Sequence, residues 1–136
     1  MIRLMCATVT ALAFAAAAAP VSGHHSFAAE YDSNQPVKLT GAVTKIEWTN
    51  PHVYFYIDVK DPETGRLTNW ALEMGAPAVI ARNGWKRSSM KIGDIVIVEG
   101  FRAKSGRPHA NARTVTLAAT GQRLGAGSSF GQDAQQ

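Results

Sequence analysis

Four histidines are the residues of this chain whose types and positions could do chemistry: His24, His25, His52 and His109. Export cleavage after Gly23 would make His24 the first residue, with a free α-amine beside its imidazole. Amine and ring could chelate one metal ion together, and a third histidine nitrogen would complete a T-shaped set suited to copper(II). His52 is the expected third ligand, because it starts a strand directly after a turn that contains proline. His25 or His109 could take its place.

A purely structural role stays open for the same residues. A histidine at the start of a mature chain can be only a polar residue, and His52 at a strand end can hydrogen-bond to the turn before it. No HxH, HxxH or HExxH pattern is present to favour a metal site.

Two tyrosines form a second candidate surface. Tyr54 and Tyr56 alternate with apolar residues in the run HVYFYIDVKD, so they lie on the outer face of the strand that this run predicts. An aromatic face can stack on sugar rings or bases, although outward tyrosines could also cover a neighbouring loop. The alternative function is therefore a non-metal interaction module that binds a protein or glycan partner on this face.

Neither catalysis nor nucleic-acid binding is predicted. The sequence has no Gly-x-Ser-x-Gly motif and no phosphate-loop spacing, so we expect a binding protein that is not an enzyme. The net charge is +4, and the basic residues are spread along the chain from Lys38 to Arg123. A nucleic-acid site would concentrate them in one patch. The expected partner is a periplasmic protein or a small ligand.

Residues 1–23 have the pattern of a bacterial signal peptide: a basic start, an alanine-rich apolar run and small residues at the end. Cleavage is predicted after Gly23, with Ala19 as the alternative. The sequence thus predicts a periplasmic or secreted protein with no stable membrane insertion after cleavage. The single cysteine, Cys6, lies in the removed segment, so the mature chain is expected to fold without a disulfide.

Hydrophobic periodicity predicts five strands and one short helix in the order β-β-β-α-β-β. The expected strands are 37–48, 52–61, 66–74, 94–104 and 112–120, and the expected helix is 76–83. The first strand changes phase near Thr44 or Lys45, which indicates a β-bulge. This order is typical of a small OB-like barrel, with an SH3-like barrel or an open sandwich as alternatives.

The domain is expected to span residues 24–119, and the Gly-, Ser- and Gln-rich residues 120–136 to form a disordered tail. Large aromatic side chains dominate the cores of small domains. The three tryptophans, Trp48, Trp70 and Trp85, are therefore assigned to the core.

Several segments together resemble a known family: HHSFAAEYD after the signal peptide, LTGAVTKIEWTNPH, NWALEMGAP, RNGWKRSSMKIGD and ARTVTL. They resemble a family of small exported bacterial proteins that carries only a domain-of-unknown-function label, over about residues 24–119. The resemblance implies a periplasmic or secreted protein. It implies no activity and no site residues.

Overall fold

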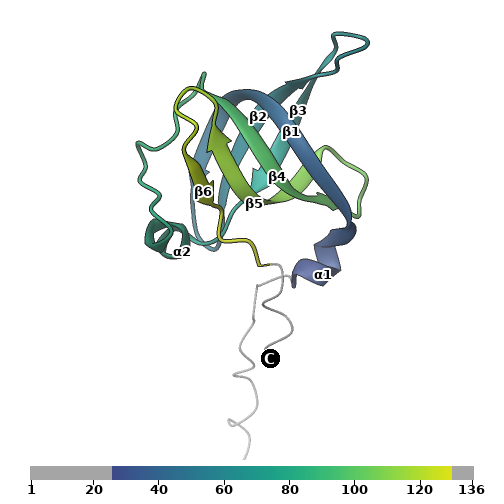
Figure 1. The fold of residues 1–136 in the computed structure, drawn as a ribbon. Coiled ribbons are helices and arrows are strands. Elements are labelled where there is room, and N and C mark those ends of the chain that lie inside the picture. The colour runs from purple at the N-terminus through teal and green to yellow at the C-terminus, as the bar shows by residue number, and fades with distance from the viewer. Residues whose placement is uncertain (1–25, 130–136) are drawn as a thin grey trace, which may run out of the picture.

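The computed structural model describes residues 26–129, which form a β-barrel with two short helices (Figure 1). Its elements are α1 (Phe27–Glu30), β1 (Tyr31–Trp48), β2 (Val53–Lys60), β3 (Leu67–Glu73), α2 (Pro77–Arg82), β4 (Ile95–Ala103), β5 (His109–Leu117) and β6 (Arg123–Gly125). The predicted helix corresponds to α2, with Pro77 in its first turn, where a missing N–H costs nothing.

The strands pair in the order β3-β2-β1-β4-β5-β6, and an additional parallel pairing joins β3 to β5. That pairing closes β1 to β5 into a five-stranded ring, with α2 in the connection between β3 and β4. The predicted OB-like barrel is thereby confirmed. The helix α1 was not predicted, because its four residues are too few to show helical periodicity.

The long strand β1 serves two neighbours. Its first part pairs with β4 and its second part pairs with β2. The register with β2 shifts between Val43 and Lys45, which confirms the predicted bulge. The strand begins at Tyr31, six residues before the predicted start. The prediction missed this part because residues 32–35 are polar and show no alternation.

The barrel interior is filled by the apolar phase of the strands. Val53, Phe55 and Ile57 of β2 are fully buried. Trp70 and Trp85 are buried as predicted, whereas Trp48 is only partly buried against the core, with the Arg87 guanidinium 5.3 Å from its ring centroid. The prediction for Trp48 is therefore wrong in degree, since its strand ends at the rim of the barrel.

The C-terminal segment is part of the domain up to residue 129. Strand β6 pairs with β5, Ala126 is fully buried, and the Trp85 indole N–H donates to the Gly125 carbonyl at 2.9 Å. The predicted disordered tail is thus wrong for residues 120–129. Their composition gave no signal because the contacts are made mostly by backbone groups. Residues 130–136 lie outside the described part.

Across residues 26–129, no helix has the length and apolar character that crossing a membrane requires. The predicted signal peptide, residues 1–23, lies outside the described residues, as do Cys6 and both candidate cleavage points.

Candidate functional site

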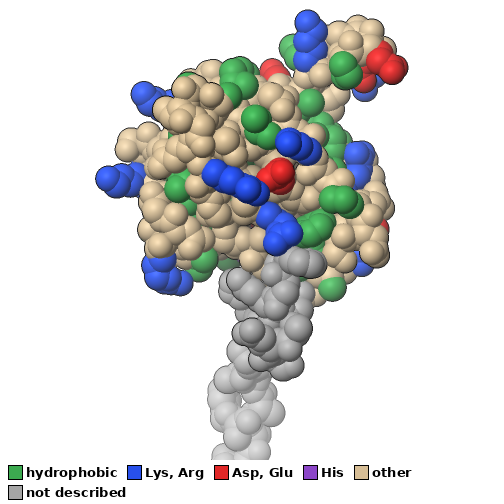
Figure 2. Space-filling model, viewed as in Figure 1, with side chains coloured by type: hydrophobic (Ala, Val, Ile, Leu, Met, Phe, Trp, Pro, Cys, Tyr) green, Lys and Arg blue, Asp and Glu red, His purple; other side chains and the backbone are tan. Residues whose placement is uncertain are grey.

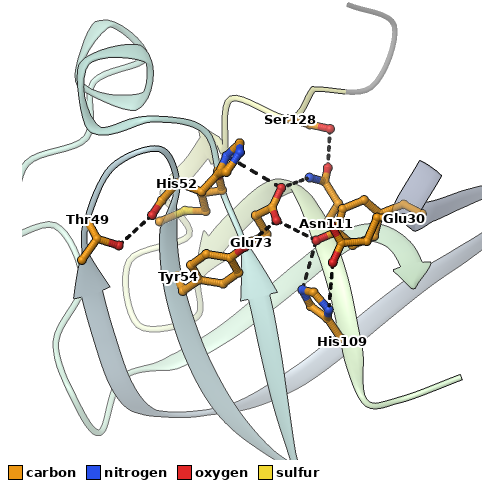
Figure 3. Close-up of polar contacts among 10 residues, drawn as sticks. Glu30, Thr49, His52, Tyr54, Glu73, His109, Asn111 and Ser128 are labelled. Carbon is orange, nitrogen blue, oxygen red and sulfur yellow. Dashed lines mark hydrogen bonds and ion pairs between the residues drawn. The ribbon is translucent and has the colours of Figure 1, made fainter. Parts of the chain in front are cut away.

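Strand register places three polar side chains in a row across β2, β3 and β5. Tyr54 is opposite Glu73, and Glu73 is opposite Asn111. Directly opposite residues lie on the same face of a sheet. The neighbouring phase, with Phe55 and Leu72, fills the interior. The row therefore lies on the outer face of the barrel, where Figure 3 shows the three side chains converging.

The Glu73 carboxylate is the centre of this row, and only 5% of the residue is exposed. Its Oε2 accepts hydrogen bonds from the Tyr31 hydroxyl at 2.8 Å and from the Tyr54 hydroxyl at 2.7 Å. Its Oε1 accepts a longer bond of 3.3 Å from the Asn111 amide. Three neutral donors thus satisfy a buried carboxylate, which is the condition for keeping such a group away from water.

Tyr31 covers Glu73 from outside the barrel. It belongs to a second, small apolar cluster with Phe27, Phe101 and Ala103, and only 2% of Tyr31 is exposed. The Phe27 ring packs 5.5 Å from the Tyr31 ring and also 5.5 Å from the Phe101 ring. This cluster anchors α1 on the barrel, so that Glu30 at the end of the helix and Tyr31 at the start of β1 lie at the site.

His109 begins β5 on the same outer face, beside Tyr31 and Glu30. Its Nε2 lies 3.0 Å from the Tyr31 hydroxyl, and its Nδ1 lies 3.7 Å from Glu30 Oε1. The Tyr31 and His109 rings meet edge to face with centroids 5.4 Å apart. Tyr31 therefore bridges Glu73 and His109, and the imidazole is held between a phenol and a carboxylate.

Glu30, Glu73 and His109 form a possible metal-ligand set, because one ligand atom from each lies within 4.8 Å of the others. Two carboxylate oxygens and one imidazole nitrogen are ligands that zinc and copper(II) accept. The three side chains come from α1, β3 and β5, which only the folded barrel brings together. We call these three residues the Glu73 site.

His52 lies on the other side of Glu73 (Figure 3). Its Nδ1 is 3.2 Å from the Met74 carbonyl oxygen and 3.8 Å from Glu73 Oε1. A hydrogen bond from Nδ1 to a carbonyl leaves Nε2 as the lone-pair nitrogen, the usual arrangement of a metal-binding histidine. His52 is therefore close to the Glu73 carboxylate, as a candidate ligand should be, but it is not a member of the three-residue set.

The two adjacent histidines of the predicted mature start, His24 and His25, lie outside the described residues. The described chain starts at Ser26, which directly precedes α1 and thus Glu30. His24 is two residues before Ser26, a separation that a chain spans with at most about 7 Å.

The two predicted face tyrosines have separate environments. The Tyr54 hydroxyl donates to Glu73, whereas the Tyr56 hydroxyl donates to Glu47 at 2.9 Å. The Lys45 ammonium lies 5.2 Å from the centroid of the Tyr56 ring. Both tyrosines are on the outer face as expected, but their polar ends are engaged within the domain.

The two phenols that donate to Glu73, those of Tyr31 and Tyr54, are harder to ionise than usual. Burial raises the pKa of Tyr31 above 10.0, and the Glu73 carboxylate raises it further. The same two causes, in the same order, raise the pKa of Tyr54. Ionising either phenol would place a second negative charge beside a carboxylate in a dry environment. Both hydroxyls are therefore donors throughout the physiological pH range.

The C-terminal segment also reaches this cluster. The Ser128 hydroxyl donates to the Asn111 side-chain oxygen, which orients the Asn111 amide toward Glu73. Sequence reasoning missed Glu30, Tyr31, Glu73 and Asn111 as site residues. A glutamate in phase with outward residues of a strand gives no local sign of burial, and Tyr31 is 42 positions away from it.

A family described as "Family of unknown function (DUF6152)" matches residues 10–112. No curated protein matches the chain. The mitochondrial single-stranded DNA binding protein Rim1 of S. cerevisiae is similar in structure, with 12% identity and a TM-score of 0.49 over 62% of this chain and 93% of that chain. A likeness this weak carries no argument about ligands, so the expected absence of a nucleic-acid partner stays a prediction.

Proposed function

The chain belongs to the DUF6152 family of unknown function, and we propose that it is an exported binding protein that holds a transition-metal ion at the Glu73 site. The observation that carries this proposal is the approach of Glu30, Glu73 and His109 to within 4.8 Å of one another. Their elements are far apart in the sequence, and the barrel holds them together at one place on its surface.

Charge supports a cation at this position. Glu73 is buried, and its three hydrogen-bond donors, Tyr31, Tyr54 and Asn111, are all neutral. The site has two carboxylates, and no arginine or lysine forms an ion pair with Glu73 within residues 26–129. A buried carboxylate is stabilised by a cation, and a divalent metal ion would balance both negative charges.

Copper is the metal we propose, with the predicted mature terminus as a further source of ligands. Imidazole nitrogens suit copper(II), and copper(II) heads the affinity order of the divalent first-row ions. Cleavage after Gly23 would give His24 an amine and an imidazole within reach of α1. His52 or His25 would then add nitrogen ligands to the oxygens of the Glu73 site. Periplasmic or secreted localisation is part of the same proposal.

Copper(II) and zinc(II) titrations of the exported chain test this function, after its intact mass has fixed the first residue. We expect one tightly bound ion per chain. Glu73→Gln should weaken binding about tenfold or more, because it removes a charged ligand while keeping the shape. The matched control is Glu47→Gln, since Glu47 also accepts a tyrosine hydroxyl but lies outside the site. Equal affinities of the two variants would contradict the proposal.

Histidine variants separate the ligand sets. Loss of binding in His109→Ala with retention in His52→Ala would support the three-residue set, and loss in both would extend that set to His52. An added residue before His24 tests the terminal chelate, because it removes the α-amine from the imidazole. If Tyr54→Ala and Tyr56→Ala abolish capture of a periplasmic protein or glycan and no variant binds metal, the interaction-module alternative replaces this proposal.

A further inference from the structure

A groove on the outer surface of the barrel is lined by three basic side chains, Lys38, Arg113 and Arg123. It has a volume of about 530 Å³ and runs over β1, β4 and β5 toward β6. Figure 2 shows basic side chains gathered around an acidic one on this face. The lining residues are Pro36, Val37, Lys38, Glu99, Gly100, Phe101, Arg113, Thr114 and Arg123. None of them is a member of the Glu73 site.

A β-bulge creates this groove. In the pairing of β4 with β5, Glu99 is opposite Thr114 but Gly100 is opposite Ala112, so Arg113 is the extra residue that the bulge inserts in β5. A bulge turns a side chain that would alternate to the other face. Arg113 and Thr114 are consecutive residues, yet both line the groove. The bulge therefore places the Arg113 guanidinium in the groove. With regular alternation its side chain would lie on the opposite face of β5 from Thr114.

The bulge depends on a glycine. A Cβ atom at Gly100 would lie 2.0 Å from the Asn111 carbonyl oxygen, a distance that no side chain tolerates. Gly100 thus lets β5 approach closely enough for Arg113 to be displaced. The Arg113 guanidinium then lies 5.5 Å from the centroid of the Phe101 ring, a cation–π contact that holds its plane in position.

The groove has an excess of positive charge. Arg123 donates to Glu99 Oε2 at 2.7 Å, and the Thr114 hydroxyl donates to the same oxygen at 3.0 Å. Only one Arg123 nitrogen is used in these contacts, so the rest of its five-donor fork remains for a ligand. Lys38 is directly opposite Glu99 in the register but forms no ion pair within residues 26–129. The residues that line the groove thus include three basic side chains and one carboxylate.

We propose that this groove binds a small organic oxyanion, a phosphate or a carboxylate, between Lys38, Arg113 and Arg123. Arginine forks match the geometry of both anions, and Lys38 supplies a third point charge from β1. Pro36 offers an apolar surface for the body of the ligand. The groove is about the size of known small-molecule sites. This proposal does not depend on metal binding.

The test is an amide chemical-shift titration of the full exported chain with inorganic phosphate and, separately, with glucuronate at constant ionic strength. We expect saturable shifts that centre on residues 37–38, 99–101 and 113–114 with at least one anion. Saturation by phosphate alone identifies a phosphorylated ligand, and saturation by glucuronate alone a carboxylated one. Arg113→Gln and Lys38→Gln should each weaken binding about tenfold.

The matched control is Lys60→Gln, which removes the same charge from an exposed position at the end of β2, away from the groove. It should change the dissociation constant less than about twofold, because a screened distant charge contributes little. Lys38→Gln keeps the test valid if Arg113→Gln fails to fold. Equal weakening by Lys60→Gln, absence of saturation, or binding of a single-stranded oligonucleotide but neither small anion would overturn the proposal.

Discussion

The Tyr31 hydroxyl donates to Glu73 Oε2 at 2.8 Å and lies 3.0 Å from His109 Nε2, so one side chain joins the buried carboxylate to the imidazole. Tyr31→Phe should lower the free energy of unfolding by about 1–3 kcal/mol, because a buried acceptor loses a donor. Chemical denaturation measures this loss. The control Tyr56→Phe should cost less, since Tyr56 and its partner Glu47 are more exposed. Equal losses would contradict the central position of Tyr31.

The raised tyrosine pKa values predict a limit to alkaline stability. Tyr31 and Tyr54 have folded-state pKa values above 10.0, so the folded chain holds their protons more tightly than the unfolded chain. Their stabilising contribution is complete below pH 10.0 and is lost as the pH rises from there toward the folded pKa values. Ultraviolet absorbance of tyrosinate should therefore increase together with unfolding. Ionisation of all three tyrosines before unfolding would contradict these pKa directions.

Gly100→Ala should destabilise the domain, because its Cβ atom would lie 2.0 Å from the backbone oxygen of Asn111. A clash with backbone cannot be relieved by a rotamer change, so we expect a loss of about 1–3 kcal/mol or more. Gly125→Ala is the control, since the nearest atom to its Cβ is 3.7 Å away. Thermal unfolding of both variants measures the difference, and a stable Gly100→Ala protein would argue against the bulge geometry.

Strand β6 should contribute to stability although its composition is that of a tail. A chain that stops after Gln122 loses the pairing with β5, the buried Ala126 and the acceptor of the Trp85 indole N–H. Its free energy of unfolding should be about 2 kcal/mol lower than that of the full chain. A chain that stops after Ser129 keeps all of these contacts and is the control. If both chains have the same stability, β6 is not a structural part of the domain.

The fold was more predictable than the site. Alternation in residues 52–61 and the phase change near Lys45 depend on neighbours in sequence, and the structure confirms both the strand and the bulge. The period of β3 assigned Trp70 and Leu72 to the core and left Glu73 outside. Glu73 is on the outer face but buried, because Tyr31 and α1 cover it. No local sequence pattern indicates that Tyr31, 42 positions away, covers Glu73.

Two further differences have the same origin. Ser128 and Gly125 act through a hydroxyl and a backbone carbonyl on partners far along the chain, so a Gly- and Ser-rich composition was interpreted as disorder. The residues around Arg113 predict a strand. Only the pairing of β5 with β4 shows that a bulge points the Arg113 side chain toward the groove. Pairwise contacts of this kind are absent from composition and periodicity.

A crystal structure of the copper-loaded, exported protein, with anomalous scattering recorded at the copper edge, tests the central claim most directly. We predict one anomalous peak within bonding distance, about 2.0–2.2 Å, of a Glu73 oxygen and a His109 nitrogen, with Glu30 as a further ligand. Histidine nitrogens from His52 or the mature terminus would complete its coordination. A peak held elsewhere on the chain, or a fully loaded protein with no metal at Glu73, would contradict the account.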